Sequence, residues 1–522
     1  MAHAWSHTHN WEALVVDLFT FAWRFSSDRW QLLVTPFIGA ALISCGSDLT
    51  SSGSPDETLV ASATGTHARW YVTPTGTSGG TGASSSPWSL SYALAGAGGK
   101  IQPGDTVWLR GGTYKPGALN ATVHGTSGSP VIVRQYPGER VQVYGTFSIS
   151  GPDVWYWGFE QATNTLSQDR MGFDVHAARV KLINLIIHDN AGNGVGNWAD
   201  APDAEVVGCV IYNNGYWGSS GSWPNPDSWG HGIYVQNRAP ATKLLRQNIV
   251  FQQFGYGFHL YAQGDHIDNV TVQGNVAFRN GLKNGFDFIN HSGTYPTTNL
   301  QVKGNWFDGN PVIWLYGDPG VSSTVDGNRI IGGGCLRFFD WSAGQLIVRN
   351  NTCQAGGGSY AVDASNVSPS KISWSGNRWY GNISAAIWRW NGALYSFSQW
   401  KSKTGLGGSD TYAGTAAPAA VLVQASPYEP GQGLIAIYNP SAAGSVSVDI
   451  SSIVPVGKPF AIRNVYNLGG SPLASGTYRG GTVSVPMTVI PPPTPYNGSR
   501  GWNGITPPQV LPKFGAFRVT GS

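Results

Sequence analysis

The chain has 522 residues, of which 71 are glycine and 22 are tryptophan, and only 11% of its residues are charged. This length is sufficient for two domains with a large buried core, and the composition favours turn-rich β structure and excludes a disordered chain. The formal net charge is +3 and no run of lysine and arginine occurs, so nothing indicates a nucleic-acid partner. The four cysteines fit neither a disulfide scaffold nor a zinc motif, and Cys335 and Cys353, in successive repeats, can form at most one bridge.

The first 45 residues are typical of a lipoprotein-type signal segment. Residues 31–44 form an apolar run of signal-peptide length, which is too short to span a bilayer comfortably. The sequence LISC at 42–45 resembles a bacterial lipobox, which implies that Cys45 is lipidated and begins the mature chain. Residues 46–66 are rich in serine and glycine and predict a tether. We therefore expect an extracytoplasmic protein, secreted or lipid-anchored, that touches a membrane only through this anchor.

A different pattern begins at residue 67. Residues 88–96 predict a short amphipathic helix, which would cover the open end of a solenoid core. The stretch YVTPTG…PWSLSYALAGAGGKIQPGDTVWLRGGTY resembles the opening of right-handed parallel β-helix proteins of the pectate-lyase-like superfamily. The later stretches HGIYVQN, FGYGFHLYA and GNVAFRNG resemble a bacterial branch of that group, the β-helix repeat proteins. The resemblance implies this fold and an action on carbohydrate.

A short phrase recurs between residues 184 and 377, with an anchor residue followed by an apolar strand. Its anchors are Asn184, Cys209, Asn248, Asn275, Asn305, Asn328, Asn351 and Asn377. The spacing of 23 to 39 residues is that of a solenoid coil, and the longest step, from 209 to 248, indicates a loop insertion. An asparagine at a bend tolerates the left-handed conformation, and its amide can bond to the equivalent amides in neighbouring coils. We expect such a ladder, with Cys209 as a small apolar filler.

A second apolar alternation follows each anchor, for example Gly-Ile233-Tyr-Val235 and Gly-Phe258-His-Leu260. Two strands per repeat, with almost no helical periodicity, predict a parallel β-helix over residues 67–412. Residues 394–401 predict a covering helix at its C-terminal end, and residues 413–420 predict a linker.

The last segment, residues 421–522, contains short strands separated by turns, which predicts a small β-sandwich. It resembles the accessory β-sandwich found behind many glycan-active catalytic domains. The fold class that we expect is therefore all-β, a right-handed parallel β-helix followed by a small C-terminal β-sandwich. The sequence gives no information on the oligomeric state.

Side chains between the core positions of the second strand must face outward, because side chains alternate across a strand. Stacking the coils predicts one outward column of Asp174, Gly196, Tyr234, His259, Asp287, Trp314, Arg337 and Trp388. A neighbouring column, two residues on, consists of His176, Trp198, Gln236, Tyr261, Ile289, Tyr316, Phe339 and Trp390. Aromatic, histidine, aspartate and arginine side chains on this face indicate a sugar-binding groove.

The residues that we expect to act on substrate come from these columns and the loop before them. The catalytic candidates are His259, Tyr261, Asp287, Arg337, His231 and Tyr234. The substrate-binding candidates are Gln236, Trp198, Trp217, Trp223, Trp229, Trp314, Tyr316, Asp340 and Arg389. The three loop tryptophans, at 217, 223 and 229, would wall the groove, since aromatic faces stack on sugar rings.

Three functions remain open, with a polysaccharide as the partner in each. A lyase acting on an acidic polysaccharide needs a neutralised substrate carboxylate, a base and an acid. His259 or His231 would be the base and Tyr234 or Tyr261 the acid. Arg337, or a calcium ion (Ca2+) held by Asp287 with Asp318 or Asp340, would neutralise the carboxylate; no cofactor or metal site is otherwise indicated.

A glycoside hydrolase instead needs two carboxylates about 5 to 9.5 Å apart. Asp287 and Asp340 come from coils two steps apart, roughly 10 Å along the axis, which is marginal for an inverting pair. A non-catalytic glycan-binding surface protein would show the same groove. The chain also lacks the acidic calcium cluster of pectate lyases and the aspartate trio of β-helix polygalacturonases. The resemblance therefore transfers no catalytic residue, and histidine, tyrosine and arginine in the columns favour a lyase.

Overall fold

The computed structural model describes residues 67–521, apart from 164–170, 216–229, 283–284, 292–294, 296, 311, 318, 322, 342–343 and 496–507. The chain divides into two compact units, Met1–Glu57 and Thr58–Ser522, and every described residue belongs to the second. The predicted signal segment, the tether and Cys45 lie outside the described residues. The predicted domain boundaries stay predictions.

The second unit is a right-handed parallel β-helix followed by antiparallel sheets, which confirms the predicted fold class. One wall of the helix is a 12-stranded parallel sheet. Its strands are β1 (Arg69–Val72), β2 (Thr106–Leu109), β4 (Val131–Gln135), β6 (Val154–Trp157), β9 (Lys181–Ile183), β12 (Glu205–Val207), β15 (Lys243–Arg246), β19 (Val270–Gln273), β23 (Gln301–Lys303), β27 (Ser323–Asp326), β30 (Leu346–Arg349) and β33 (Ile372–Ser375).

A second wall is covered by the C-terminal sheets. Its strands are β7 (Glu160–Ala162), β10 (Ile186–His188), β13 (Val210–Tyr212), β16 (Ile249–Phe251), β20 (Val276–Phe278), β24 (Trp306–Asp308), β28 (Arg329–Ile331), β31 (Thr352–Gln354), β34 (Arg378–Tyr380) and β37 (Thr411–Ala413).

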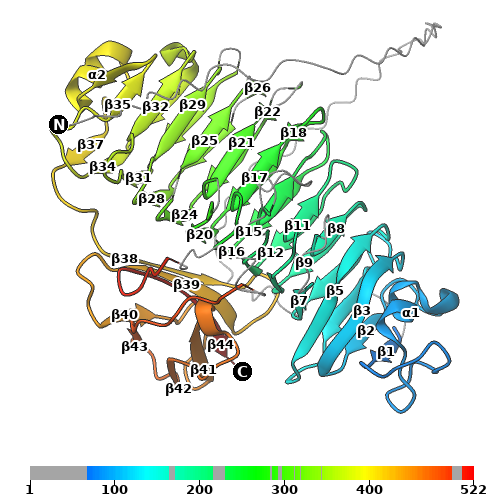
Figure 1. Cartoon of the computed structure of the whole chain (residues 1–522). Coiled ribbons are helices and arrows are strands. Elements are labelled where there is room, and N and C mark those ends of the chain that lie inside the picture. Colours follow the sequence, from blue (N-terminus) through cyan, green and yellow to red (C-terminus); the bar gives the residue numbers. More distant parts are fainter. Residues whose placement is uncertain are drawn as a thin grey trace, which may run out of the picture. The chain divides into compact units, whose positions relative to one another are not determined.

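The third wall, which we call the groove face, is stacked in the same way (Figure 1). Its strands are β8 (Phe173–Val175), β11 (Val195–Asn197), β14 (Ile233–Val235), β17 (Phe258–Tyr261), β21 (Phe288–His291), β25 (Ile313–Tyr316), β29 (Leu336–Phe339), β32 (Val362–Ser365) and β35 (Trp388–Trp390), to which β36 (Ala393–Tyr395) pairs in antiparallel fashion. The long strands β3 (Gly112–Ala121) and β5 (Val141–Ile149) begin the second and third walls, and β18 (Ile267–Asp268), β22 (Thr297–Thr298) and β26 (Pro319–Val321) form a small separate sheet.

Short helices lie at the two ends of the stack (Figure 1). Helix α1 (Leu90–Leu94) is capped by Ser89 and buries Leu90, Ala93 and Leu94 against the first coils. Helix α2 (Phe397–Thr404) has a capping box at Ser396, ends at Gly405 in the left-handed conformation, and buries Trp400 at the other end of the core. Single 3-10 turns occur at Ala97–Gly99, Pro369–Lys371 and Val465–Asn467. Within the described residues, no helix combines the length and apolar character needed to cross a membrane.

The predicted asparagine ladder is present from Asn248 onward. Each side-chain amide donates to the carboxamide oxygen of the next coil, at 3.0 Å from Asn248 to Asn275 and 2.9 Å from Asn275 to Asn305. The row continues through Asn328, Asn351 and Asn377 and ends at the carboxylate of Asp410. These amides are buried and fully paired, so they stabilise the bends of the coils.

The prediction that Asn184 belongs to this ladder is wrong. Ile183 pairs with Val207, so Leu185, and not Asn184, lies beside Cys209. Asn184 has φ 52° and occupies the bend position before the ladder residue, which is glycine in other coils, for example Gly274 with φ 63°. Its amide donates instead to Glu429 of the C-terminal segment. The left-handed residue and the ladder residue are thus neighbours in sequence and not one residue.

A second polar ladder, which we had not predicted, runs along the bend that precedes the groove face. It links Gln161, Asn190, Asn214, Gln253, Asn280 and Asp287 through successive side-chain and backbone hydrogen bonds. Both ladders end on an aspartate, whose carboxyl oxygen accepts a hydrogen bond from the last amide. Cys335 and Cys353 form a disulfide, the single bridge that the sequence permitted, and Cys209 is a buried free thiol.

The C-terminal segment forms a five-stranded antiparallel sheet and a two-stranded sheet. The first contains β38 (Ala420–Ala425), β39 (Gln432–Tyr438), β44 (Phe514–Gly521), β41 (Pro459–Asn464) and β42 (Ala474–Thr477), and the second contains β40 (Ser445–Asp449) and β43 (Thr482–Pro486). Ile435 and Ile437 face the core between these sheets, whereas Leu434 and Ala436 face the second wall of the solenoid. The C-terminal sheet therefore packs on the second wall, whereas the groove face is the third wall.

Candidate functional site

The outward side chains of the groove face are set by the parallel register of its strands. The first column consists of Asp174, Gly196, Tyr234, His259, Ile289, Trp314, Arg337, Asp363 and Arg389. The second column, two residues further along each strand, contains Tyr261, His291, Tyr316, Phe339 and Ser365. Neighbouring residues of a column belong to successive coils, about 4.8 Å apart, and we call each step a rung.

The predicted place of Asp287 in the first column is wrong. Strand β21 begins at Phe288, which pairs with Phe258, so Ile289 takes the column position. Asp287 lies before the strand, is fully buried, and accepts a 2.8 Å hydrogen bond from the amide of Asn280. Burial raises the pKa of Asp287 well above its usual value, so its carboxyl group favours the neutral form. We assign it a structural role as the end of the second ladder.

The predicted outward residues at the C-terminal end of both columns, Trp388 and Trp390, are also wrong. Trp388 pairs with Val362 and is fully buried against Trp400, so Arg389 faces outward instead. The sequence Ala-Ile387-Trp was aligned with Ile387 inward, and a slip of one residue moves every side chain to the other face. Trp390, predicted for the second column, is likewise buried.

Histidine and tyrosine rings gather where β14, β17 and β21 adjoin. The ring of His259 lies 4.3 Å from that of His231, 5.1 Å from that of Tyr234 and 4.7 Å from that of Tyr256. Tyr261 stacks on His259 at 5.4 Å and on His291 at 4.8 Å. These rings, which we call the central cluster, are His231, Tyr234, Tyr256, His259, Tyr261 and His291.

Within the central cluster, His259 and Tyr261 are partly exposed on the groove face, as is His291. Burial, together with the neighbouring His231 and His291, lowers the pKa of His259 well below its usual value. Its Nδ1 atom is buried without a hydrogen-bond partner in the described part of the chain, so no contact there fixes its tautomer. The lowered pKa means that His259 favours the neutral imidazole, the form that can accept a proton.

His231, Tyr234 and Gln236 are the buried residues in and beside the central cluster. His231 is buried, and its Nδ1 accepts a 3.0 Å hydrogen bond from the backbone N–H of Tyr256, which places the ring proton on Nε2. The Tyr234 hydroxyl donates to the backbone oxygen of Tyr261 at 3.1 Å, and the Gln236 amide donates to Ala262 at 2.9 Å. Of the predicted catalytic candidates, His231 and Tyr234 have polar atoms bonded within the chain, whereas His259 and Tyr261 are partly exposed.

Arg337 belongs to a separate group of charges. The Asp363 carboxylate, 1% exposed, receives Arg389 at 2.7 and 3.0 Å and lies 3.5 Å from Nε of Arg337. Arg337 also lies over the rings of Phe286 and Trp314, at 5.4 and 5.3 Å. It is three rungs from His259, about 14 Å, so the two side chains would not contact the same sugar carboxylate.

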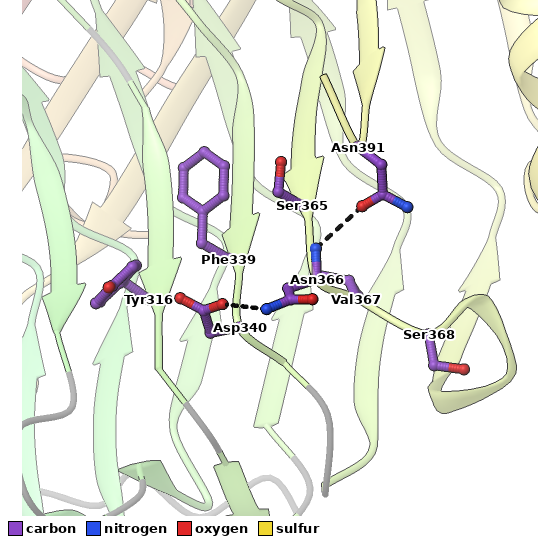
Figure 2. A pocket seen from close by; sticks show the side chains of 8 residues that line it. All are labelled: Tyr316, Phe339, Asp340, Ser365, Asn366, Val367, Ser368 and Asn391. Atoms are coloured by element: carbon purple, nitrogen blue, oxygen red, sulfur yellow. Dashed lines mark hydrogen bonds between the residues drawn. The ribbon is translucent and has the colours of Figure 1, made fainter. Parts of the chain in front are cut away.

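A hollow of about 770 Å³ opens at the strand ends of the last rungs (Figure 2). Tyr316 and Phe339 supply aromatic surface, and Asp340, Asn366 and Asn391 supply polar groups. The side chains of Asp340 and Asn366 point toward one another, with a 2.9 Å hydrogen bond from the amide to the carboxylate (Figure 2). Predicted binding residues Tyr316 and Asp340 therefore lie together in one concave surface.

At the other end of the groove face, Trp198 packs on Tyr234 with ring centroids 5.1 Å apart, and its indole donates to Asp174. The predicted loop tryptophans Trp217, Trp223 and Trp229 lie outside the described residues.

The proposed calcium ligands do not fit a metal site. Asp287 is buried in the ladder, Asp318 lies outside the described residues, and Asp340 is bonded to Asn366. No group of three or more histidine, cysteine, aspartate or glutamate side chains is placed to hold a metal ion in the part of the chain that the structure describes.

Two residues of the groove face escaped the sequence analysis. His291 is absent from the prediction because the sequence pattern starts strand β21 two residues too early. Asp363 is absent because the predicted strand pattern Tyr-Ala361-Val ends one residue before it. A signal was present for each: His291 follows a Phe-Ile-Asn strand pattern, and Asp363 lies between the apolar residues Val362 and Ala364.

Comparisons with known proteins bear on the solenoid. Residues 70–298 match a family model described as Pel9A-like, right handed beta helix region. Pectate lyase L of Dickeya dadantii (strain 3937) is 25% identical over 338 residues, which cover 60% of this chain and 69% of that protein. The crystal structure of pectate lyase Pel9A is 19% identical, with 67% of this chain and 79% of that chain covered and a TM-score of 0.38. A rhamnogalacturonan lyase structure is 15% identical, with 59% and 87% covered and a TM-score of 0.43. The family match includes the central cluster and ends before Arg337.

Proposed function

Because residues 70–298 form a right-handed β-helix of the Pel9A-like, pectate-lyase-like type, we propose that this protein cleaves an acidic polysaccharide by β-elimination. The observation that supports this most is the stacked pair of His259 and Tyr261, which is partly exposed on the groove face beside His291. The similarity to pectate lyase L, at 25% identity, supports a polyuronate as the class of polymer.

In this proposal His259 accepts the proton from C5 of a uronate unit. The electron pair of that C–H bond forms the C4–C5 double bond, the bond from C4 to the leaving oxygen breaks, and the Tyr261 hydroxyl gives its proton to that oxygen. A base must be unprotonated to act, and burial keeps His259 neutral.

A hydrolase has less support. The rungs of β14, β17 and β21 present Tyr234, His259 and Ile289 in the first column and Tyr261 and His291 in the second. None of these side chains is a carboxylate, whereas hydrolysis of a glycosidic bond ordinarily needs two. The predicted pair of Asp287 and Asp340 also has no support, since Asp287 is buried.

A panel of polysaccharides, incubated with the full chain, tests the proposal. Elimination gives a new ultraviolet absorbance from unsaturated ends, hydrolysis gives new reducing ends without it, and retention without either product indicates a non-catalytic glycan-binding protein. A chelator in parallel reactions shows whether calcium is required.

The site assignment is tested by His259→Ala and Tyr261→Phe, each of which should reduce elimination by about 100-fold or more, since a positioned acid or base contributes on that scale. His124→Ala is the matched control, because His124 is exposed and follows β3, five strands before β17 in the stack. Full activity in either site variant would reject the assignment.

We also propose an extracytoplasmic location, since a polymeric substrate of this kind would be met outside the cytoplasm. Incorporation of labelled fatty acid into the natural chain, and its loss in Cys45→Ser, tests the lipid anchor. Absence of the label from the natural chain would reject the anchor and leave the secreted form.

A further inference from the structure

The groove face carries two arginines around a single carboxylate. Four other arginines of the solenoid each pair with one acidic residue: Arg110 with Glu139, Arg179 with Asp153, Arg238 with Asp265 and Arg349 with Asp326. Arg337 and Arg389 share Asp363, which leaves one positive charge in excess on an outward face. This group is three rungs from His259, outside the match to the family model.

The two arginines are bound unequally. Arg389 forms a two-pronged pair with Asp363, through Nε at 2.7 Å and a terminal nitrogen at 3.0 Å. Arg337 makes a looser ion pair at 3.5 Å and no hydrogen bond in the part of the chain that is described. Its side chain is 29% exposed, so its terminal N–H groups remain available to a ligand. A planar guanidinium with available donors matches the geometry of a carboxylate.

Aromatic rings fix the position of Arg337. Its guanidinium lies over Phe286 and Trp314, and Arg389 lies over Tyr360 at 4.8 Å. Packing of this kind holds a long side chain in place before a ligand arrives, which reduces the entropy lost on binding.

We propose that Arg337, with Arg389 held by Asp363, binds the carboxylate of a uronate unit several sugars away from the bond that is cleaved. The hollow lined by Tyr316, Phe339 and Asp340 begins at Phe339, two residues beyond Arg337 on the same strand, and its volume is sufficient for the ring of that unit. The Asp340 carboxylate repels an anion, so the uronate carboxylate turns toward the arginines. This inference rests on the proposed function and adds that the protein prefers long acidic chains, which span the about 14 Å between the two groups.

Binding and cleavage separate the two proposals. In a His259→Ala background, which leaves bound sugar intact, isothermal titration with a galacturonate hexamer measures affinity without turnover. Arg337→Gln should weaken this affinity by about tenfold or more, the scale of one charge-assisted hydrogen bond. Arg349→Gln removes the same charge from β30, on a different wall, and should leave the affinity unchanged. A carboxyl-reduced, neutral hexamer should bind weakly to all variants.

In the background with His259 intact, Arg337→Gln should lower kcat/KM for the hexamer at least tenfold and leave that for a trimer nearly unchanged. The inference would be overturned if Arg337→Gln and Arg349→Gln bound the acidic hexamer with equal affinity, or if the neutral hexamer bound as tightly as the acidic one. Either result would leave the proposed elimination reaction unaffected. Arginine-dependent binding without any elimination product would instead retain the subsite and reject the lyase.

Discussion

His188 in β10 provides a charge pair whose contribution to stability can be worked out. Its side chain is 11% exposed, with Nε2 3.2 Å from Glu160 and Nδ1 2.6 Å from Asp189. Burial opposes the charged imidazole, but the hydrogen bonds to Asp189 and Glu160 outweigh it and raise the pKa of His188 to about 9. Burial likewise opposes the charged form of Glu160, and its bonds to His188, Arg140 and Gln142 lower its pKa to about 2.

The magnitude follows from linkage. A histidine pKa of about 9, against an ordinary 6.5, corresponds to about 3 kcal/mol of unfolding free energy. Because the folded pKa is the higher one, this contribution is fully present below pH 6.5 and is lost as the pH rises through 9. The lowered pKa of Glu160 reports the same contact, so the two shifts are not added.

We therefore expect His188→Gln to destabilise the chain by about 3 kcal/mol at pH 6, and by much less at pH 9.5. The assay is urea unfolding followed by tryptophan fluorescence over that pH range, for the natural chain and the variant. His124→Gln, at an exposed histidine, is the control and should follow the natural chain. If His188→Gln shows the same loss of stability with rising pH as the natural chain, the charged pair is not the cause and the reasoning is refuted.

Two further results are expected. Since the pKa of His259 lies below 6.5, the acid limb of the pH profile of kcat/KM should also lie below pH 6.5, and a limb above pH 7 would contradict His259 as the base. Asn305→Asp should lower the free energy of unfolding by about 3 kcal/mol or more, because a buried carboxylate would face the acceptor oxygens of Asn328 and Val272. Asn120→Asp, at an exposed position, is the control. Equal urea midpoints for the two variants would contradict the stabilising role of the ladder.

The sequence was sufficient for the fold because the ladder residue and the apolar strand after it recur together in every coil from 248 to 377. It was less reliable for the groove face, where the distance from the bend to the strand varies. Strand β21 begins later than the pattern suggested, which moved Asp287 out of the column and His291 into it. Only pairing between coils determines such a register, and pairing is a property of the neighbours and not of the strand alone.

The burial and bonding of individual side chains could also not be predicted from the sequence. Tyr234 and His259 look alike as outward residues of adjacent strands, yet Tyr234 is buried and its hydroxyl donates to a backbone oxygen, while His259 is partly exposed. The shared carboxylate of Asp363 could not be inferred either, because it depends on two arginines that are 52 residues apart, from 337 to 389, being brought to either side of it by successive coils.

The row of hydrogen bonds from Asn248 to Asp410 has a direction: each asparagine amide donates to the next residue of the row toward the C-terminus, and its carboxamide oxygen accepts from the preceding one. Asp410 can only receive, and it does so from Asn377 and from the indoles of Trp374 and Trp379. Duplication of a coil between Asn275 and Asn351 would therefore preserve every link. A coil added after Asp410 would face a carboxylate that has no hydrogen-bond donor to continue the row. Coils could therefore be inserted or removed within the row without loss of these hydrogen bonds. At the C-terminal end the row offers no further donor, and α2 covers the core there.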